Sequence, residues 1–482
     1  MPSLKKNALY NSSYQVIRLI VPLITYPYVS RLIGPGGIGT VTYAEAVVGY
    51  FTTFALLGMP VYGTRAISQS RVNSGDTDQI FSELFFIVTV TSWISLLAYI
   101  SLPLLAPALV ADSFLFWLFA IILFMNGGDL SWFFGGIENY RYIAFRNFIV
   151  RFFGLVLTFV LVRTSDHYLR YGLIWFLTSI TMLLINISFA FKNVKLIWKG
   201  LNFRRHLIAL VPTAALVFSN VFYKNIDVFM VGLLVPDERF SVGLYSTASR
   251  IIQIAMTLIT AAAAVTMPRV AFHHASGDSQ ATERVIGRTL SMTLFLALPM
   301  TVGTLFVSSD MIHLFAGARF YPSIHTLQIL APELILITLS GVIGTHIFYA
   351  RGMEKTVLSI SLTGFVIAIL LNLWLIPRYT FNGAAVATVI SRLFVLIIGL
   401  YASRALVFRL LFTAEHVRMI VATMVLALFL WGGTYMLADF HVSVRFIIVI
   451  LFSTALFSMT SLLLKIETAQ RIWSLFQFHR SR

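Results

Sequence analysis

The chain has 482 residues, of which 58% are hydrophobic and 11% charged, and its formal net charge is +16. Soluble domains carry about 25% charged residues, so this composition, with a mean hydropathy of +0.86, excludes an ordinary soluble enzyme and indicates a membrane protein. The chain contains no cysteine, which excludes disulfides, thiol nucleophiles and thiolate metal sites.

Apolar stretches of about 20 residues recur along the whole chain, each long enough to cross about 30 Å of hydrocarbon. The first follows MPSLKK and lacks a small-residue cleavage site, so we expect it to be retained as a span. We predict an all-α polytopic membrane protein with about 14 transmembrane helices. In chain order they are expected near residues 9–33, 38–62, 84–110, 113–135, 142–163, 168–191, 206–234, 242–268, 289–309, 324–349, 356–377, 383–403, 416–438 and 442–464.

Lysine and arginine are distributed unevenly between the two sides that these spans define. With the N-terminus in the cytoplasm, most of them fall in loops and termini on the cytoplasmic side, and far fewer fall in the outer loops. This asymmetry follows the positive-inside rule. It predicts that both termini are cytoplasmic. It also explains the basic charge of the chain, so we expect no nucleic-acid partner.

The sequence contains weak internal repeats that pair each matching span with the sixth span after it. Gly39 aligns with Gly243, and Glu138 aligns with Glu354. The matching stretches are IGTVTYAEA (38–46) with VGLYSTASR (242–250), FGGIEN (134–139) with ARGMEK (350–355), and YGLIWFLTSI (171–180) with NGAAVATVIS (382–391). Three matches in the same order predict a duplicated architecture.

The repeats predict two six-helix lobes and an additional pair of helices. Residues 1–200 would form the N-lobe with helices 1–6, and residues 201–410 the C-lobe with helices 7–12. Residues 411–482 would hold helices 13 and 14 and a cytoplasmic C-terminal tail. Because each lobe has an even number of spans, we expect the lobes to be related by a pseudo-two-fold axis along the membrane normal.

Ionisable side chains inside the predicted spans lie on stripes of polar residues. Residues three and four positions apart share one face of a helix, and ionisable groups within a span mark a transport pathway by default. The stripes predict a polar cavity lined by spans 1, 2, 7 and 8. Its predicted cations are Arg18, Lys224, Arg250 and Arg392, and its predicted carboxylates are Glu45, Asp129 and Asp227.

Simpler explanations compete for some of these residues. The side chain of Arg18 can snorkel toward the interface, and Lys224 and Asp227 can simply neutralise each other. Arg250 and Arg392 have no oppositely charged partner in their own helices, so they are the stronger candidates. Four cations against three carboxylates make the predicted cavity net positive, which suits an anionic head group.

Motifs for enzyme chemistry are not convincing in this sequence. GPGGIG (34–39) matches the dinucleotide pattern GxGxxG, but that site requires a strand before it and a helix after it. Here the glycines are expected to form the outer turn between spans 1 and 2. We therefore predict no catalytic residue, no metal site and no cofactor.

Three stretches resemble a known family: LIGPGGIGTVTYAEA (32–46), GMPVYGTRAIS (58–68) and NIDVFMVGLLVPDERFSVGLYSTASRI (225–251). They are similar to the Wzx-type polysaccharide and O-antigen repeat-unit flippases, which form the polysaccharide-transporter branch of the multidrug/oligosaccharidyl-lipid/polysaccharide (MOP, MATE-like) exporter superfamily. The similarity covers essentially the whole chain. The recurring aspartate of span 7 falls on Asp227, and the YGTR element falls on Tyr62 to Arg65.

The resemblance implies a transporter of the bacterial inner membrane rather than an enzyme. It would flip an undecaprenyl-diphosphate-linked oligosaccharide from the cytoplasmic to the periplasmic leaflet by alternating access, for O-antigen or capsule-type polysaccharide biosynthesis. Its expected partners are this lipid-linked substrate, the lipid bilayer, H⁺ or Na⁺ as a coupling ion, and the polysaccharide polymerase machinery. The open alternatives are a MATE-like cation-coupled drug exporter, a lipid II flippase and, last, a membrane glycan polymerase or ligase.

Overall fold

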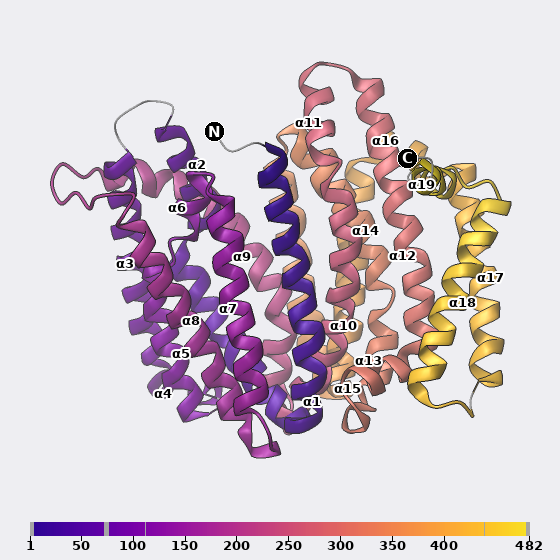
Figure 1. Ribbon diagram of the computed structural model, residues 1–482, viewed down its shortest axis with the longest axis horizontal. Helices are drawn as coiled ribbons and strands as arrows, with labels where there is room; N and C mark the ends of the chain where they lie inside the picture. The colour runs from indigo at the N-terminus through magenta and orange to yellow at the C-terminus, as the bar shows by residue number, and fades with distance from the viewer. Residues whose placement is uncertain (1–3, 72–76, 111, 438, 479–482) are drawn as a thin grey trace. The chain divides into compact units, whose positions relative to one another are not determined.

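The computed structural model describes residues 4–71, 77–110, 112–437 and 439–478 of the chain. These residues form α-helices, short 3₁₀ segments and one π-helical segment, and they include no strand. The chain divides into two compact units, Met1–Gly243 (unit 1) and Leu244–Arg482 (unit 2). Figure 1 shows that nearly all of the long helices in each unit run in the same up-and-down direction.

Unit 1 is built from nine helices and the start of a tenth within its described residues. They are α1 (Leu4–Leu56), α2 (Met59–Ser70), α3 (Thr77–Ile100), α4 (Leu102–Leu105), α5 (Ser113–Met125), α6 (Ser131–Gly136), α7 (Tyr140–Leu161), α8 (Tyr168–Ala190), α9 (Phe203–Leu234) and the beginning of α10 (Glu238–Ala264). The 3₁₀ segments of this unit are η1 (Pro107–Leu109), η2 (Asn126–Gly128) and η3 (Ser165–His167). The boundary between the units falls inside α10, so α9 is grouped with unit 1.

Unit 2 contains the rest of α10 and the remaining helices of the described chain. They are α11 (Met267–Ala275), α12 (Ser279–Phe315), α13 (Ser323–Leu330), α14 (Glu333–Val342), α15 (Glu354–Ala402), α16 (Arg404–Leu411), α17 (Ala414–Met436), α18 (Val442–Leu463) and α19 (Glu467–Phe478). Its short segments are η4 (Ala318–Phe320), the π-helical η5 (Ile343–Phe348) and η6 (Tyr349–Arg351).

The prediction of an all-α polytopic membrane protein is confirmed. By length and composition, 11 helices of the described chain can cross a membrane, or up to 12 if the bent pair Phe203–Ser219 and Val221–Leu234 counts as one span. Two of these helices each contain two of the predicted spans. α1 covers the predicted span 9–33 and most of 38–62, and α15 covers 356–377 and nearly all of 383–403.

Both long helices break where their sequences weaken the helix. In α1, Gly34 has φ 71° and is followed by Pro35, so the glycine supplies a left-handed backbone that most residues avoid. The predicted turn within GPGGIG is therefore confirmed. In α15, the break falls at Thr380, whose φ of 51° lies three residues after Pro377. Proline removes a backbone hydrogen bond from the helix, which explains why a non-glycine residue adopts this conformation there.

The predicted span 113–135 matches the candidate membrane span Ser113–Gly136, but its helix is interrupted in its second half. α5 ends at Met125, η2 follows, and the backbone of Asp129 is extended before α6 begins. Gly127 and Gly128 favour the break, since glycine loses the most backbone freedom in a helix. Asn126 and Asp129 therefore do not form a stripe on one continuous helix.

The centre of unit 1 is rich in aromatic side chains. Phe81 of α3 lies at its middle, with its ring centroid 5.6 Å from that of Trp132 and 4.9 Å from that of Phe133. All three side chains are almost fully buried. Aromatic rings bury large apolar areas and pack edge to face, so this cluster fixes α3 against α6.

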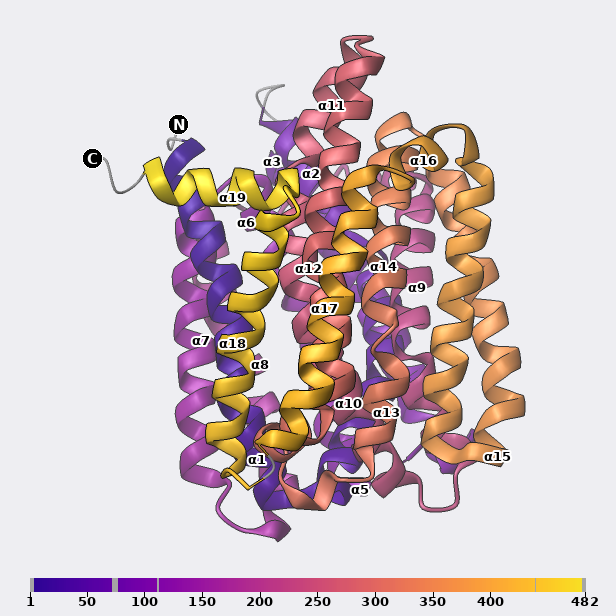
Figure 2. The ribbon, with the colours of Figure 1, turned by 90° about the vertical axis from the view of Figure 1, so that its right-hand side faces the viewer.

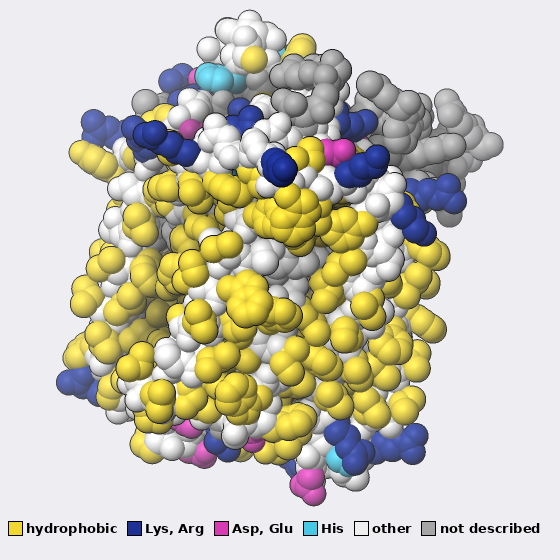
Figure 3. Space-filling view, turned by 90° about the vertical axis from the view of Figure 1, so that its left-hand side faces the viewer, with side chains coloured by type: hydrophobic (Ala, Val, Ile, Leu, Met, Phe, Trp, Pro, Cys, Tyr) yellow, Lys and Arg dark blue, Asp and Glu magenta, His cyan; other side chains and the backbone are white. Residues whose placement is uncertain are grey.

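Apolar side chains also cover the outside of the helices. Figure 3 shows a broad apolar band across the visible face, with lysine and arginine side chains along its upper and lower edges. Exposed residues such as Leu97 of α3 and Phe145 of α7 belong to this kind of surface, each 65% exposed. In water such a surface would drive association. In a bilayer it is the lipid-facing surface.

Two glycines that the internal repeat aligns lie at a very close backbone approach within unit 1. A Cβ atom added to Gly39 would lie 1.6 Å from the carbonyl oxygen of Arg239, and one added to Gly243 would lie 1.9 Å from the carbonyl oxygen of Pro35. The second half of α1 and the start of α10 can therefore meet only because neither residue has a side chain.

Candidate functional site

The residues predicted to form the site fall in both units. Unit 1 holds Glu45, Asp129, Lys224 and Asp227, and unit 2 holds Arg250 and Arg392. Arg18 lies in α1, but its side chain is outside the described residues. Each pair of helices that brings predicted residues together lies within one unit.

In unit 1, the second half of α1 packs against α9 in an antiparallel arrangement. The ring centroids of Tyr50 and Phe222 are 4.5 Å apart, and those of Tyr43 and Phe229 are 6.4 Å apart. Along this contact, a higher residue number on α1 faces a lower residue number on α9. The Tyr50–Phe222 and Tyr43–Phe229 pairs have the same register. A helix advances about 1.5 Å per residue, so this register places Glu45 level with residue 227 of α9.

The structure therefore brings three predicted residues to one level of the α1–α9 contact: Glu45, Lys224 and Asp227. The carboxylate of Asp227 is buried, Glu45 is half-buried and Lys224 is exposed. The buried hydroxyl of Tyr50 lies within electrostatic range of Asp227. Burial of a carboxylate inside a membrane helix pair is costly, so Asp227 is the residue of this group with the strongest reason to have a function.

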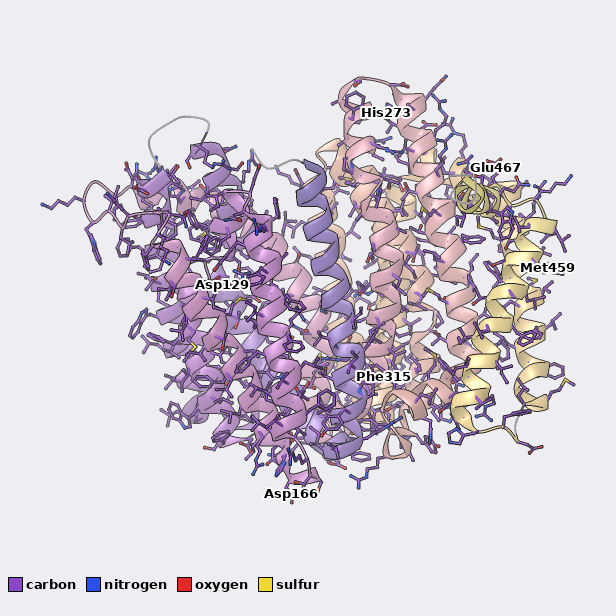
Figure 4. The ribbon with its side chains drawn as sticks, viewed as in Figure 1. Asp129, Asp166, His273, Phe315, Met459 and Glu467 are labelled. Atoms are coloured by element: carbon purple, nitrogen blue, oxygen red, sulfur yellow. The ribbon has the colours of Figure 1, made fainter. Side chains whose placement is uncertain are left out.

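Asp129 lies elsewhere in unit 1, away from both ends of the helix bundle (Figure 4). Its Oδ1 accepts hydrogen bonds from the Ser131 backbone N–H at 3.0 Å and from the Ser131 hydroxyl at 2.5 Å. The neighbouring Asn126 donates to the hydroxyl of Thr52 on α1 at 3.2 Å. Asp129 thus supports the first turn of α6, which is a structural role that its position in a predicted span did not suggest.

A cavity of about 220 Å³ lies beside Asp129, between α5, α7 and α8. Asn186 of α8 lines it, is fully buried, and accepts a hydrogen bond from the guanidinium of Arg146 at 2.6 Å. Arg146 is itself 3% exposed. Arg146 lies inside the predicted span 142–163, but it was not among the predicted site residues, so the sequence analysis missed this buried cation.

In unit 2, Arg250 and Arg392 lie at the same depth on two packed helices. The hydroxyls of Tyr245 on α10 and Thr388 on α15 are 3.1 Å apart. Both helix segments then run toward the end of unit 2 that carries α11 and α16, as Figures 1 and 2 show. Arg250 and Arg392 follow this contact by five and four residues, so the two guanidinium groups start from nearly the same level.

Arg392 has a counter-ion that the sequence analysis did not identify. Its Nε lies 3.5 Å from Oε1 of Glu333 at the start of α14, and both side chains are mostly buried, 22% and 11% exposed. Glu333 lies inside the predicted span 324–349, so its position in an apolar stretch was the available clue. At the level of Arg250 and Arg392, unit 2 therefore holds two cations and one carboxylate, Glu333, which partly neutralises the charge of Arg392.

A second missed carboxylate, Asp310 of α12, is bound by Arg445 of α18. The guanidinium donates from Nε to Oδ2 at 2.8 Å and from Nη2 to the other carboxylate oxygen. Such a two-point arginine–carboxylate contact is specific in geometry as well as strong. It joins the C-terminal helix pair to the body of unit 2.

The third missed carboxylate, Glu83 of α3, is fully buried in unit 1. Its Oε2 accepts hydrogen bonds from Arg205 at 2.9 and 2.7 Å and from Nε2 of His206 at 2.7 Å, and its Oε1 accepts the Asn202 backbone N–H at 2.7 Å. The other ring nitrogen of His206 lies 2.8 Å from the hydroxyl of Tyr62, the first residue of the YGTR element. This cluster fixes the start of α9 to α2 and α3.

Metal chemistry has no obvious location in the described part of the chain, where no group of three or more His, Asp or Glu side chains is arranged to hold an ion. What the described site residues offer is charge: two guanidinium groups at one level of unit 2, and a lysine with two carboxylates at one level of unit 1. These groups can bind an anionic ligand and a small cation, respectively.

Comparison with protein families gives two overlapping matches. The model of the family described as "Polysaccharide biosynthesis protein" matches residues 4–273, which is more than half of the chain, and the MatE model matches residues 212–374. The first match contains residues 4–243 of unit 1 as well as the segment 225–251 that carries the resemblance noted in the sequence.

Curated relatives and solved structures are consistent with these matches. A putative O-antigen transporter of Escherichia coli K12 is 23% identical over 399 residues, covering 80% of this chain and 92% of the relative. A probable low-salt glycan biosynthesis flippase of Haloferax volcanii is 29% identical over 170 residues, or 35% of each chain. The inward closed lipid II flippase MurJ has a TM-score of 0.69 at 15% identity, covering 94% of this chain and 98% of MurJ. An inward-facing MATE multidrug transporter has a TM-score of 0.65 at 16% identity, with coverages of 85% and 96%.

Proposed function

Because the chain belongs to the polysaccharide biosynthesis protein family, as its sequence motifs predicted, we propose that it flips lipid-linked oligosaccharides across a membrane. In the finer form of the proposal, the substrate is an undecaprenyl-diphosphate-linked repeat unit of an O-antigen or capsule-type polysaccharide. It moves from the cytoplasmic to the periplasmic leaflet of the bacterial inner membrane by alternating access, and both chain termini are cytoplasmic. The alignment with the E. coli O-antigen transporter, along 80% of this chain, carries the proposal.

The charges of the site residues support an anionic substrate. In this proposal Arg250 and Arg392 bind the diphosphate, with Arg18 and Lys224 as further cations. A guanidinium group binds two phosphate oxygens at once, and it stays protonated in every protein environment. Glu333 lies 3.5 Å from Nε of Arg392 and holds its guanidinium group in position.

The carboxylates of unit 1 are proposed to serve the coupling ion. Asp227 and Glu45 lie at one level of the α1–α9 contact, and a carboxylate in an apolar environment binds H⁺ or Na⁺ more readily than one in water. Asp129 remains a third candidate for this role, although its hydrogen bonds to Ser131 give it a structural role as well.

The alternatives share the fold but differ in the charge that they require. A MATE-like exporter of cationic drugs needs an acidic binding surface, whereas the Arg250–Arg392 level is basic. A lipid II flippase would also bind a diphosphate, and it differs in the sugar it carries. A glycan polymerase or ligase would form glycosidic bonds, and deletion of the gene distinguishes such an enzyme from a flippase.

Deleting the gene is expected to leave lipid-linked repeat units inside the cell and to remove the surface polysaccharide. Complementation with Arg250→Ala or Arg392→Ala is expected to restore less than about a tenth of the surface polysaccharide, since each change removes a charged contact to the diphosphate. Immunoblots of polysaccharide and of the epitope-tagged protein measure both quantities. Arg269→Gln, an exposed arginine on α11, is the control.

Three results would contradict this proposal. Full complementation by both alanine variants at normal protein levels would exclude the arginines as diphosphate ligands. Accumulation of single repeat units on the periplasmic side would indicate a polymerase or ligase instead. Loss of cell-wall precursor export, with surface polysaccharide intact, would indicate a lipid II flippase.

The roles of Lys224 and Asp227 are separable by combining their substitutions. If Asp227 binds the coupling ion, Asp227→Asn is expected to abolish transport, and Lys224→Gln added to it is expected not to restore transport. If the two residues only neutralise each other, the double variant regains the activity that each single variant loses. The same complementation assay measures all three variants, with protein levels as the reference for correct folding.

A further inference from the structure

A polar pocket lies at the end of unit 2 that carries the C-terminal helix. It has a volume of about 710 Å³ and is enclosed by α12, the start of α17 and α19. Figure 2 shows α19 lying across the end of the α17–α18 pair, roughly at right angles to them. Figure 4 labels Glu467, the first residue of α19, at this end. None of the predicted site residues lines the pocket.

Arginine side chains line this pocket from two sides. Arg284 and Arg288 are one helical turn apart on α12, and Arg471 faces from α19. Arg288 is exposed and makes no ion pair with any described residue, and Arg284 contacts only the backbone oxygen of Gln280 at 3.3 Å. Arg471 is paired with Glu467 at 2.8 Å. The two arginines of α12 therefore offer guanidinium groups that are not engaged by a carboxylate in the described chain.

Three carboxylates also line the pocket: Glu283, Glu415 and Glu467. Glu467 is paired with Arg471, and Glu415 is held by hydrogen bonds from the protein. Glu415 accepts from the hydroxyl of Ser291 on α12 at 3.1 Å, and from the backbone N–H and hydroxyl of Thr468 on α19 at 2.9 and 2.8 Å. One carboxylate thus joins α12, α17 and α19 in the wall of the pocket. Its charge faces donors of the protein, so it does not oppose an anion bound by Arg284 and Arg288.

The pocket lies where apolar spans meet polar helix ends. The candidate span of α17 begins at Ala414, in the pocket wall, and the candidate span of α18 ends at Leu463, four residues before α19. Large apolar side chains next to the pocket are exposed: Phe412 is 78% exposed, Leu463 69% and Trp473 53%. Exposed aromatic residues at the end of a span are typical of the membrane–water interface.

We propose that this pocket binds the phosphate headgroup of an anionic phospholipid from the adjacent leaflet. Arg284 and Arg288 bind the phosphate, Arg471 contacts it from α19, and the acyl chains lie along the exposed apolar surface beside Phe412 and Leu463. Guanidinium groups beside exposed apolar side chains fit a ligand that has both an anionic headgroup and an apolar tail. A soluble phosphate has only the anionic part. This site is independent of the transported substrate.

The test is lipid binding to the purified full-length protein in neutral detergent. Native mass spectrometry measures the Kd of the most tightly bound phosphatidylglycerol in the wild type and in the double variant Arg284→Gln/Arg288→Gln. Each basic residue near a membrane surface contributes enough attraction that losing two is expected to raise this Kd about thirtyfold. The matched control is Arg269→Gln/Arg351→Gln, which removes the same charge from exposed arginines at the same end of unit 2 and outside the pocket.

Several outcomes would overturn the proposal. The control could raise the Kd as much as the pocket variant does, phosphatidylcholine could bind as tightly as phosphatidylglycerol, or inorganic phosphate at millimolar concentration could displace the lipid. The last result would indicate a site for a soluble phosphate. Helix content and melting temperature without lipid confirm that the variant is folded. If it is not, the single change Arg471→Gln is expected to raise the Kd about fivefold.

Discussion

Replacing Gly39 by alanine is expected to prevent normal folding of unit 1. A Cβ atom at this position would lie 1.6 Å from the Arg239 carbonyl oxygen and 2.8 Å from the Gly243 backbone nitrogen. These are backbone atoms, so no side chain can rotate away, and α1 and α10 would have to separate. Overpacking of this kind costs about 3 kcal/mol or more, which exceeds the gain of about 1 kcal/mol from replacing a helical glycine by alanine.

Gly36→Ala is the matched control for this prediction. Gly36 lies in the same part of α1, and an added Cβ there would meet no atom within 4 Å. The amount of protein in the membrane fraction and the melting temperature in detergent measure the effect. We expect the amount of membrane protein and the melting temperature to fall strongly for Gly39→Ala. Both are expected to keep their wild-type values for Gly36→Ala. Equal behaviour of the two variants would show that the close approach does not determine stability.

Replacing Glu83 by alanine is expected to be the most destabilising charge change in unit 1. The substitution leaves Arg205, His206 and the Asn202 N–H without their common acceptor. Breaking a buried ion pair on one side costs about 3–5 kcal/mol. The side chain of Arg205 is 40% exposed and regains some hydration in the variant. We therefore expect Glu83→Ala to lower the free energy of unfolding by about 3 kcal/mol. Glu83→Gln keeps part of the hydrogen bonding and is expected to lose less.

The control for Glu83 is another ion pair with similar length but different burial. Glu467 and Arg471 are joined at 2.8 Å, but their side chains are 64% and 52% exposed. An exposed pair of this kind contributes about 0.3–0.5 kcal/mol, so Glu467→Ala is expected to leave the melting temperature nearly unchanged. Thermal unfolding of both variants in the same detergent makes the comparison. Similar shifts would mean that burial does not set the strength of the Glu83 cluster.

The sequence predicted the helices well because hydrophobic length is a local property. A run of about 20 apolar residues forms a span whatever the rest of the chain does, and the break at Gly34 could be predicted from GPGGIG alone. The break after Met125 could not, because it depends on the hydrogen bonds of Asp129 to Ser131 as well as on Gly127 and Gly128. The break at Thr380 was also predicted, since it falls in the gap between the predicted spans 356–377 and 383–403.

The site was harder to predict because its charges are paired over long distances in the chain. The missed carboxylates Glu83, Asp310 and Glu333 bind arginines that are more than 50 residues away in sequence. Helical spacing reveals only partners on the same helix. It could not reveal Glu333, which lies on another helix, as the counter-ion of Arg392. Arg146 shows the opposite error, since a position near the end of a predicted span did not reveal that the residue is buried.

The contact between Asp310 and Arg445 has a consequence for how a chain of this kind changes in length over evolution. The last two spans, α17 and α18, follow the two predicted six-helix lobes and look like an addition. Yet Asp310 of α12 depends on Arg445 of α18 for its counter-ion. A shorter relative without this helix pair would expose the carboxylate to lipid, where an unpaired charge is costly. We therefore expect a relative that lacks the helix pair to carry a neutral residue at the position of Asp310.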